Sequence, residues 1–306
     1  MDLLILIVGL TFLIIGAELI IRGSVSFGKK LNVSLFAIGV VIVAGGTSLP
    51  ELASSINAVV SNHADLAVGA VVGSNIANLI LVMAATSFIV PIDKINQNQI
   101  NQAWINILIA IVLIIMNLFI LPFNFIFGIV SIVFLFFVMS FQVKRGTLDV
   151  SEVKEKGDYS LFLSITFIMI GIIILVYGSD LFVESAINIA NQLNIPAALI
   201  GVSLVAFGTS LPELVVGILS AIRRKVDFAL GNILGSNIYN VLGVLGVSSF
   251  FGNFKVPKVI GFADLLFMLF VTLMILGFMF FLKRIGRTYG SIGLILYVGY
   301  IFYIYN

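Results

Sequence analysis

Long apolar runs, separated by short polar segments, make up most of the chain. Each run has about 20 residues, which is the length that an α-helix needs to cross the hydrocarbon core of a bilayer. The runs predict ten membrane-spanning helices, at 3–21, 34–60, 65–90, 101–121, 123–143, 160–183, 195–222, 227–251, 258–282 and 288–305. The polar stretch 144–158 divides them into two groups of five and is predicted as a short linker.

The composition supports the same class of protein. Of the 306 residues, 61% are hydrophobic and 10% are charged, and the mean hydropathy is +1.23, a balance that would make a soluble domain aggregate. The first run lacks the basic flank and the cleavage site of a signal peptide, so it is predicted as the first span. We therefore expect an all-α integral membrane protein of the cell membrane, surrounded by lipid, with no nucleic-acid partner and no obligatory protein partner.

The two groups of five runs are copies of each other. With an offset of 162 residues, the sequence aligns with itself without a gap from about Leu13 to Val82. Two motifs, GTSLPEL and GSNI, occur once in each copy. The first motif begins at Gly46 and Gly208, and the second begins at Gly73 and Gly235. Such a duplication predicts two five-helix repeats, 1–143 and 159–306, which are most similar at about 34–85 and about 196–247.

The basic residues predict that the two repeats have opposite orientations in the membrane. Because each repeat has an odd number of helices, the second starts from the opposite side of the bilayer. Fourteen of the 16 Lys and Arg residues fall near or in the loops after the odd-numbered runs. These are Arg22, Lys29, Lys30, Lys94, Lys144, Arg145, Lys154, Lys156, Arg223, Arg224, Lys225, Lys283, Arg284 and Arg287. By the positive-inside rule, those loops and the linker are cytoplasmic and both termini are extracellular. Inverted repeats with interrupted helices are an architecture of secondary transporters.

The repeated GTSLPEL motif places helix-breaking residues in the middle of an apolar run. Pro50 has no N–H, so the carbonyl oxygen of Gly46 loses its helical partner, and Pro212 has the same effect in the second repeat. We therefore expect helices 2 and 7 to be interrupted. Such a break survives inside a membrane only where protein, water or an ion satisfies the freed backbone groups.

Possible oxygen ligands surround each predicted break. In each repeat, four of these residues lie at the break and would share one face of a helix. The following apolar run adds a Ser and an Asn four positions apart, which also share a face. The candidate metal ligands are Ala44, Thr47, Ser48, Glu51, Ser74 and Asn78 in the first repeat, and Ala206, Thr209, Ser210, Glu213, Ser236 and Asn240 in the second. Oxygen donors without any Cys favour hard cations such as Ca²⁺ over zinc or copper. Two carboxylates balance the charge of one divalent ion, or of two or three sodium ions in an alternative loaded state.

The doubled motifs resemble those of the calcium/cation antiporter superfamily, and specifically its sodium/calcium exchanger branch of the prokaryotic type. The resemblance covers nearly the whole chain. It implies antiport of three Na⁺ for one Ca²⁺. We expect this antiport to need no prosthetic group and to work by alternating access, with the first and sixth helices, at the front of each repeat, as the moving pair. The resemblance further implies that Glu51 and Glu213 form a central calcium site with the backbone oxygens of Thr47 and Thr209. The flanking sodium sites would use the carbonyl oxygens of Ala44 and Ala206 with Ser48, Ser210, Ser74 and Ser236.

Some relatives in this superfamily have Asp where this chain has Asn240. The amide carries no charge, so we expect transport that does not require K⁺. The residues leave open whether Asn78 and Asn240 contact an ion or orient the glutamates, and whether the equivalent acids Glu18 and Asp180 are solvated at the membrane interface or guide ions. H⁺/Ca²⁺ antiport and a passive cation channel are alternatives. An enzyme is not expected, because the sequence has no nucleophile–base set or cofactor motif.

Overall fold

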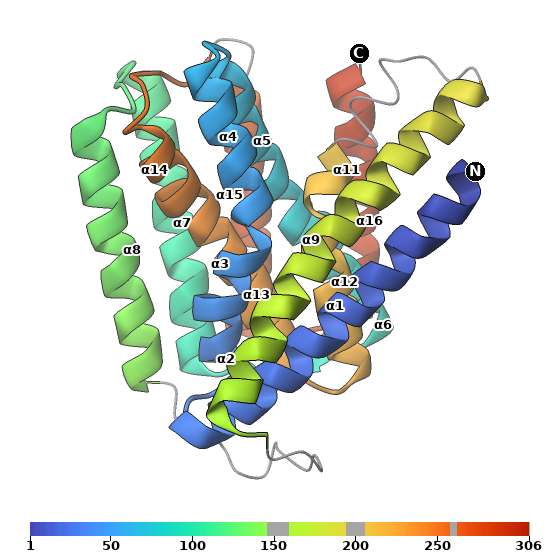
Figure 1. The fold of residues 1–306 in the computed structure, drawn as a ribbon. Helices are drawn as coiled ribbons and strands as arrows, with labels where there is room; N and C mark the ends of the chain where they lie inside the picture. The colour runs from blue at the N-terminus through green and yellow to red at the C-terminus, as the bar shows by residue number, and fades with distance from the viewer. Residues whose placement is uncertain (146–158, 194–205, 258–261, 306) are drawn as a thin grey trace.

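The structure is a computed structural model that describes residues 1–145, 159–193, 206–257 and 262–305. These residues are predominantly helical (Figure 1), so the predicted all-α class is confirmed. Parts of three predicted segments lie outside the described residues. They are 146–158 of the linker, 194–205 at the start of the seventh predicted helix, and 258–261 at the start of the ninth.

Seven helical segments in the described ranges are long and apolar enough to cross a membrane. They are α1 (Asp2–Leu31), the α5–α6 segment (Ala64–Ile89), α7 (Gln97–Leu118), α8 (Phe125–Arg145), α9 (Leu161–Gln192), the α13–α14 segment (Val226–Ser248) and the segment that begins with α15 (Phe262–Leu282). The chain from α2 to α4 (Leu35–Val60), bent by 43° at its break, would count as an eighth if it forms one span. The remaining helices are α11 (Ala206–Thr209), α12 (Leu211–Ile222) and α16 (Arg287–Tyr305).

Three of these segments contain a π-helical turn between two α-helices, and a fourth segment ends in one. The first is η1 (Gly39–Val43), which joins α2 (Leu35–Ile38) to α3 (Ala44–Thr47). The others are η2 (Asn78–Met83), between α5 (Ala64–Ala77) and α6 (Ala84–Ile89), and η5 (Tyr239–Leu245), between α13 (Val226–Ile238) and α14 (Gly246–Ser248). A fourth, η6 (Phe278–Leu282), ends the segment of α15 (Phe262–Gly277). The π-helical turns η2 and η5 fall at equivalent positions of the two predicted repeats.

Helices α1 and α9 run side by side across the front of the molecule in Figure 1. Both are longer than the predicted helices at 3–21 and 160–183, because their polar ends remain helical. The C-terminal end of α1 is closed by Asn32, whose φ of 55° is left-handed and whose N–H donates to Gly28 and Lys29 carbonyl oxygens. At Gly16 the two helices approach so closely that a Cβ would lie 2.7 Å from the carbonyl oxygen of Gly171. Small residues of this kind allow close helix packing in membranes.

Short backbone pairings join connections that are distant in sequence. Strand β1 (Ile92–Asp93) pairs antiparallel with β2 (Arg284–Ile285), which joins the connection after α6 to the one before α16. The peptide groups of Phe123 and Phe254 form an isolated bridge between the connection before α8 and the one after α14. Each pairing therefore joins a connection from the first half of the chain to one from the second half.

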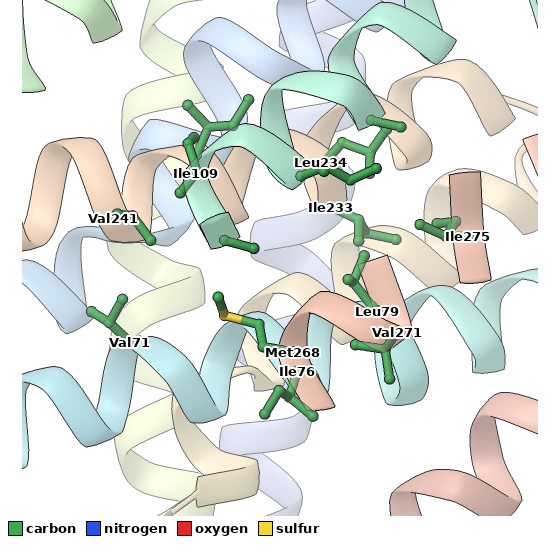
Figure 2. Packing of buried hydrophobic residues seen from close by; sticks show 14 of the residues in the cluster. Val71, Ile76, Leu79, Ile109, Ile233, Leu234, Val241, Met268, Val271 and Ile275 are labelled. Atoms are coloured by element: carbon green, nitrogen blue, oxygen red, sulfur yellow. The ribbon is translucent and has the colours of Figure 1, made fainter. Parts of the chain in front are cut away.

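The apolar core lies between α5, α7, α13 and α15. Figure 2 shows side chains from these helices converging, among them Ile76, Ile109, Leu234 and Met268. All four are buried. The α13–α14 segment lies at the centre of the bundle, with most of its residues buried, and it carries two of the twelve candidate ligands, Ser236 and Asn240.

Candidate cation site

Both glutamates of the repeated motif are fully buried directly after a helix break. Ser48 separates α3 from α4 (Leu49–Val60) with ψ near 7°, and Ser210 separates α11 from α12 with ψ near 3°. Each break is followed by a Leu-Pro pair that starts the next helix, where a proline is tolerated because the first N–H groups have no helical partner. Glu51 and Glu213 then lie in the first turn of α4 and α12, and each has a relative exposure of 0%. The positive end of a helix dipole stabilises a carboxylate at this position.

Hydroxyl groups from both halves of the chain lie close together beside the Glu213 carboxylate and the second helix break. Ser236 Oγ, on α13, lies 3.4 Å from Glu213 Oε1 and 3.4 Å from Thr47 Oγ1. In the other half, Ser74 Oγ on α5 lies 3.4 Å from Ser210 Oγ. The motif of each half therefore meets the GSN segment of the other half.

Four asparagines form a network of amide hydrogen bonds between α5–η2 and α13–η5. Asn75 Nδ2 donates to the carbonyl oxygen of Asn237 at 3.2 Å, and Asn237 Nδ2 donates to that of Asn75 at 3.1 Å. Asn78 Nδ2 donates to Asn237 Oδ1 and Asn240 Nδ2 donates to Asn75 Oδ1, both at 3.0 Å. Asn240 Nδ2 also donates to Ser74 Oγ at 3.2 Å. The amide nitrogens of Asn78 and Asn240 are thus held by protein, and their orientation is fixed.

Several buried oxygens at this place have no hydrogen-bond partner among the described residues. They are both carboxylate oxygens of Glu51, Oε2 of Glu213, Oγ of Ser48, and Oδ1 of Asn78 and of Asn240. Leaving a buried polar group without a partner costs about 1–3 kcal/mol, and a buried charge costs more. A hard cation that coordinates these oxygens would remove that cost, and carboxylate, amide, hydroxyl and carbonyl oxygens are the donor set that such a cation prefers. In the described ranges, no group of three or more His, Cys, Asp or Glu side chains is suited to a metal ion.

The remaining candidate ligands lie on the same two breaks. Ala44 is buried at the start of α3, and its carbonyl oxygen accepts the N–H of Ser48 at 3.1 Å. Thr209 ends α11 and lines a cavity of about 340 Å³ that is also lined by Pro50, Asp180 and Glu184. Ala206 begins α11, and its side chain lies outside the described residues.

The two equivalent acids Glu18 and Asp180 have different surroundings. Glu18 Oε1 lies 2.7 Å from Arg22 Nε and 2.9 Å from Arg223 Nη2, so its charge is paired within α1 and with the residue after α12. Asp180 instead lines the cavity beside Thr209 together with Glu184, four residues along α9.

A sequence model described as sodium/calcium exchanger protein matches residues 1–144 and 163–306. The chain belongs to the sodium/calcium exchanger family. The resemblance seen in the doubled motifs is thereby confirmed. An uncharacterised membrane protein of Methanocaldococcus jannaschii is 34% identical over 294 residues, which covers 95% of this chain and 94% of the relative. The sodium/calcium exchanger MaX1 of Methanosarcina acetivorans is 30% identical, and the match covers 97% of each chain.

Solved structures of another family member have the same fold. The sodium-calcium exchanger NCX_Mj, soaked with 10 mM Na⁺ and zero Ca²⁺, matches with a TM-score of 0.84 and 32% identity over 97% of this chain and 96% of that chain. The same exchanger soaked with zero Na⁺ and Ca²⁺ matches with a TM-score of 0.85. Those structures are described as showing extracellular ion exchange and occlusion of the binding site.

One buried residue at the site belongs to neither of the repeated motifs of this exchanger-family chain. Asn232 has a relative exposure of 0%, and its Oδ1 lies 3.4 Å from Thr47 Oγ1. Comparison of the repeats did not identify it, because the aligned residue is Ala70. Helical spacing could have found it, since Asn232, Ser236 and Asn240 follow one another at intervals of four and therefore share a face of the segment.

Proposed function

We propose that the chain is a secondary active antiporter that exchanges Na⁺ for Ca²⁺ across the cell membrane by alternating access. The observation that carries this proposal is the pair of fully buried glutamates, Glu51 and Glu213, with three carboxylate oxygens that lack a partner in the described structure. Two buried carboxylates suit one divalent cation or several monovalent ones. An exchanger needs such a site, because the cost of leaving it without a cation disfavours a return step without cargo.

The architecture proposed for this function is ten crossings in two inverted repeats, 1–143 and 159–306, connected by the cytoplasmic linker 144–158. The crossings are the seven long segments, the bent α2–α4 segment, the segment that ends with α11 and α12, and α16. The pairing of β1 with β2 supports it, because it joins the connections after the third and ninth crossings on one side. The bridge between Phe123 and Phe254 does the same for the connections after the fourth and eighth crossings. We propose that both termini lie outside the cell, which the distribution of basic residues supports.

We assign the metal site to the same twelve residues that the motifs indicated. Glu51 and Glu213, with the backbone of Thr47 and Thr209, form the central position for Ca²⁺. The Na⁺ positions on either side use the Ala44 and Ala206 carbonyls with the four serines. Asn78 and Asn240 contribute their Oδ1 atoms, which have no partner in the described part of the chain. Exchange of three Na⁺ for one Ca²⁺ moves net charge, and the uncharged amide of Asn240 supports transport without K⁺.

The cavity beside Thr209 supports a route for ions to this site. It lies between α9 and the break that separates α11 from α12, and Asp180 and Glu184 line it. We propose that cations enter here and that the α1–α9 pair moves against the other helices to close this side. Glu18 serves a different purpose, since its carboxylate is paired with Arg22 and Arg223.

Purified protein in vesicles tests the function directly. Vesicles loaded with Na⁺ are expected to accumulate ⁴⁵Ca²⁺ against its gradient, and a change in membrane potential is expected to alter the rate. Glu51→Gln and Glu213→Gln each remove one of the two charges, so Ca²⁺ uptake should fall to the level measured in Na⁺-loaded vesicles without the protein. Asp93→Asn, an exposed acid that pairs with Arg284 on the surface, is the control and should transport normally. Full uptake by either glutamate variant would contradict the assignment.

The same vesicles separate Na⁺/Ca²⁺ exchange from H⁺/Ca²⁺ exchange. Carboxylate oxygens that have no partner among the described residues could also bind protons, and this observation supports H⁺/Ca²⁺ exchange as the second candidate function. Calcium uptake driven by a pH gradient in vesicles without Na⁺ would favour the proton antiporter. Uptake that requires Na⁺ and is unchanged by K⁺ would favour the proposal.

A further inference from the structure

Asn232 is the residue that distinguishes the two halves of the proposed site. The twelve proposed ligands have identical counterparts at the equivalent positions of the other repeat, whereas Asn232 is aligned with Ala70. It lies on α13 one helical turn before Ser236. The GTSLPEL motif of the first repeat therefore lies beside an amide, and the motif of the second repeat has no amide at the matching position.

The segment of α13 that carries Asn232 is packed tightly against η1 and α3. A Cβ on Gly39 would lie 2.9 Å from the backbone nitrogen of Asn232, and a Cβ on Gly235 would lie 2.8 Å from the Cβ of Ala44. Such close packing fixes Asn232 relative to the backbone oxygens of α3. Its Nδ2 has no hydrogen-bond partner among the described residues, although the side chain is fully buried.

The Thr47 hydroxyl has one proton and several oxygens within reach, namely the Glu213 carboxylate and three uncharged oxygens. The distances from Thr47 Oγ1 are 3.3 Å to the carbonyl oxygen of Ala44, 3.4 Å to Asn232 Oδ1 and 3.4 Å to Ser236 Oγ. Side-chain hydroxyls in helices commonly donate to a carbonyl oxygen three or four residues back, which here is Ala44. A proton donated to that oxygen would occupy one of its lone pairs, and the N–H of Ser48 already uses another.

We propose that Asn232 is a positioning residue: when a cation occupies the Glu213 carboxylate, Asn232 accepts the Thr47 hydroxyl proton and so keeps the carbonyl oxygen of Ala44 available to Na⁺. The inference rests on the function proposed above, in which that carbonyl is a sodium ligand. It makes the two sodium positions inequivalent, because the position next to Ala206 has no amide at the matching place. The central calcium position does not use the Ala44 carbonyl, so Asn232 affects Na⁺ more than Ca²⁺.

The test is a comparison of Na⁺ and Ca²⁺ dependence in Asn232→Ala. The substitution installs the residue that the first repeat has at the equivalent position. The Na⁺ concentration that gives half-maximal exchange is expected to rise about two- to tenfold, the range that corresponds to one net hydrogen bond. The Ca²⁺ concentration for half-maximal exchange is expected to stay within about twofold. In the purified variant, a higher Na⁺ concentration should be needed for thermal stabilisation, whereas the Ca²⁺ concentration needed should be unchanged.

Two further variants distinguish positioning from a general loss of packing. Asn106→Ala removes another buried amide, one that donates to the Gln102 and Leu234 carbonyl oxygens, and it should leave both half-saturating concentrations unchanged. Asn232→Asp keeps an oxygen acceptor, so its half-saturating Na⁺ concentration should not rise. If Asn232→Ala does not fold, the half-saturating Na⁺ concentration of Asn232→Asp still tests the role of Asn232.

Three results would overturn the inference about Asn232. They are an unchanged Na⁺ dependence in Asn232→Ala, an equal shift for both ions, and a rise in Asn232→Asp as large as in Asn232→Ala. Glu51→Gln in the same vesicles keeps the two proposals separate. If Glu51→Gln abolishes exchange while Asn232→Ala behaves as the unmodified protein, only the role of Asn232 is wrong. If Glu51→Gln transports normally, the proposed function itself is wrong.

Discussion

The amide nitrogen of Asn240 uses both of its hydrogens inside the protein. They go to Asn75 Oδ1 at 3.0 Å and to Ser74 Oγ at 3.2 Å, while its oxygen has no partner in the described structure. An aspartate at this position would have the same shape with a different pattern of donors. Ionised, it would place an acceptor opposite the Asn75 oxygen and add a third buried carboxylate beside Glu51 and Glu213.

Asn240→Asp is therefore expected to make stability depend on pH. At pH 8 the loss of two donors and the new repulsion should lower the stability by about 1–3 kcal/mol, measured as a lower melting temperature in detergent. Protonation restores one donor and removes the charge, so the deficit should shrink as the pH is lowered towards 5. Asn240→Leu also loses both donors but cannot titrate, so its deficit should be the same at both pH values. A deficit of Asn240→Asp that did not change with pH would contradict this account.

Helices α1 and α9 are held together by contacts that leave no room for side chains at their glycines. Besides Gly16, a Cβ on Gly178 would lie 2.8 Å from the backbone nitrogen of Leu13 and 2.9 Å from the carbonyl oxygen of Gly9. These neighbours are backbone atoms, which cannot rotate away as a flexible side chain would. The pair therefore packs as one unit, as an element that moves between two access states would have to.

Gly16→Val is expected to separate this pair. Its Cβ would lie 2.7 Å from the Gly171 carbonyl oxygen and from the Leu175 nitrogen, and such overpacking costs about 1–3 kcal/mol. The melting temperature should fall by several degrees, and Na⁺-driven Ca²⁺ uptake should be slower. Gly299→Val on α16 is the matched control, because nothing lies within 4 Å of a Cβ there. Equal stability of the two variants would show that close contact at Gly16 does not hold the helices together.

The helix breaks and the GSN segments were predictable from sequence because each rests on a local chemical rule. A proline without an N–H determines where α4 and α12 begin, and the duplication showed that the same rule applies twice. The π-helical turns η2 and η5 and the contact between Asn232 and Thr47 were not predictable in this way, although the spacing of Asn232 from Ser236 and Asn240 placed it on the same helix face. They depend on which helices pack together, and the duplication could not reveal Asn232 because only one repeat has the amide. The helices α1 and α9 extend beyond their apolar runs for the same reason, since packing and capping determine where they end.

The two ends of the helical bundle differ in the number of basic residues, and we expect the more basic end to face the cytoplasm. The turn before α5 and strand β1 lie at opposite ends of one continuous helical segment, Ala64–Ile89. Strand β2 pairs with β1, so the start of α16 lies at the β1 end as well. Most basic residues near connections belong to that end, which the positive-inside rule assigns to the cytoplasm.

Single cysteines test this orientation without background, because the chain contains no cysteine. Ser61 and Thr288 are both exposed, carry no charge and lie at the two ends just described, so their replacement leaves the distribution of basic residues intact. In intact cells, Ser61→Cys should react with a membrane-impermeant maleimide, whereas Thr288→Cys should react only after the membrane is permeabilised. Each variant should still exchange Na⁺ for Ca²⁺, which shows that the labelled molecules are folded. The opposite labelling pattern would mean that the protein has the reverse orientation, and labelling of both sites from outside would contradict the proposed crossings between them.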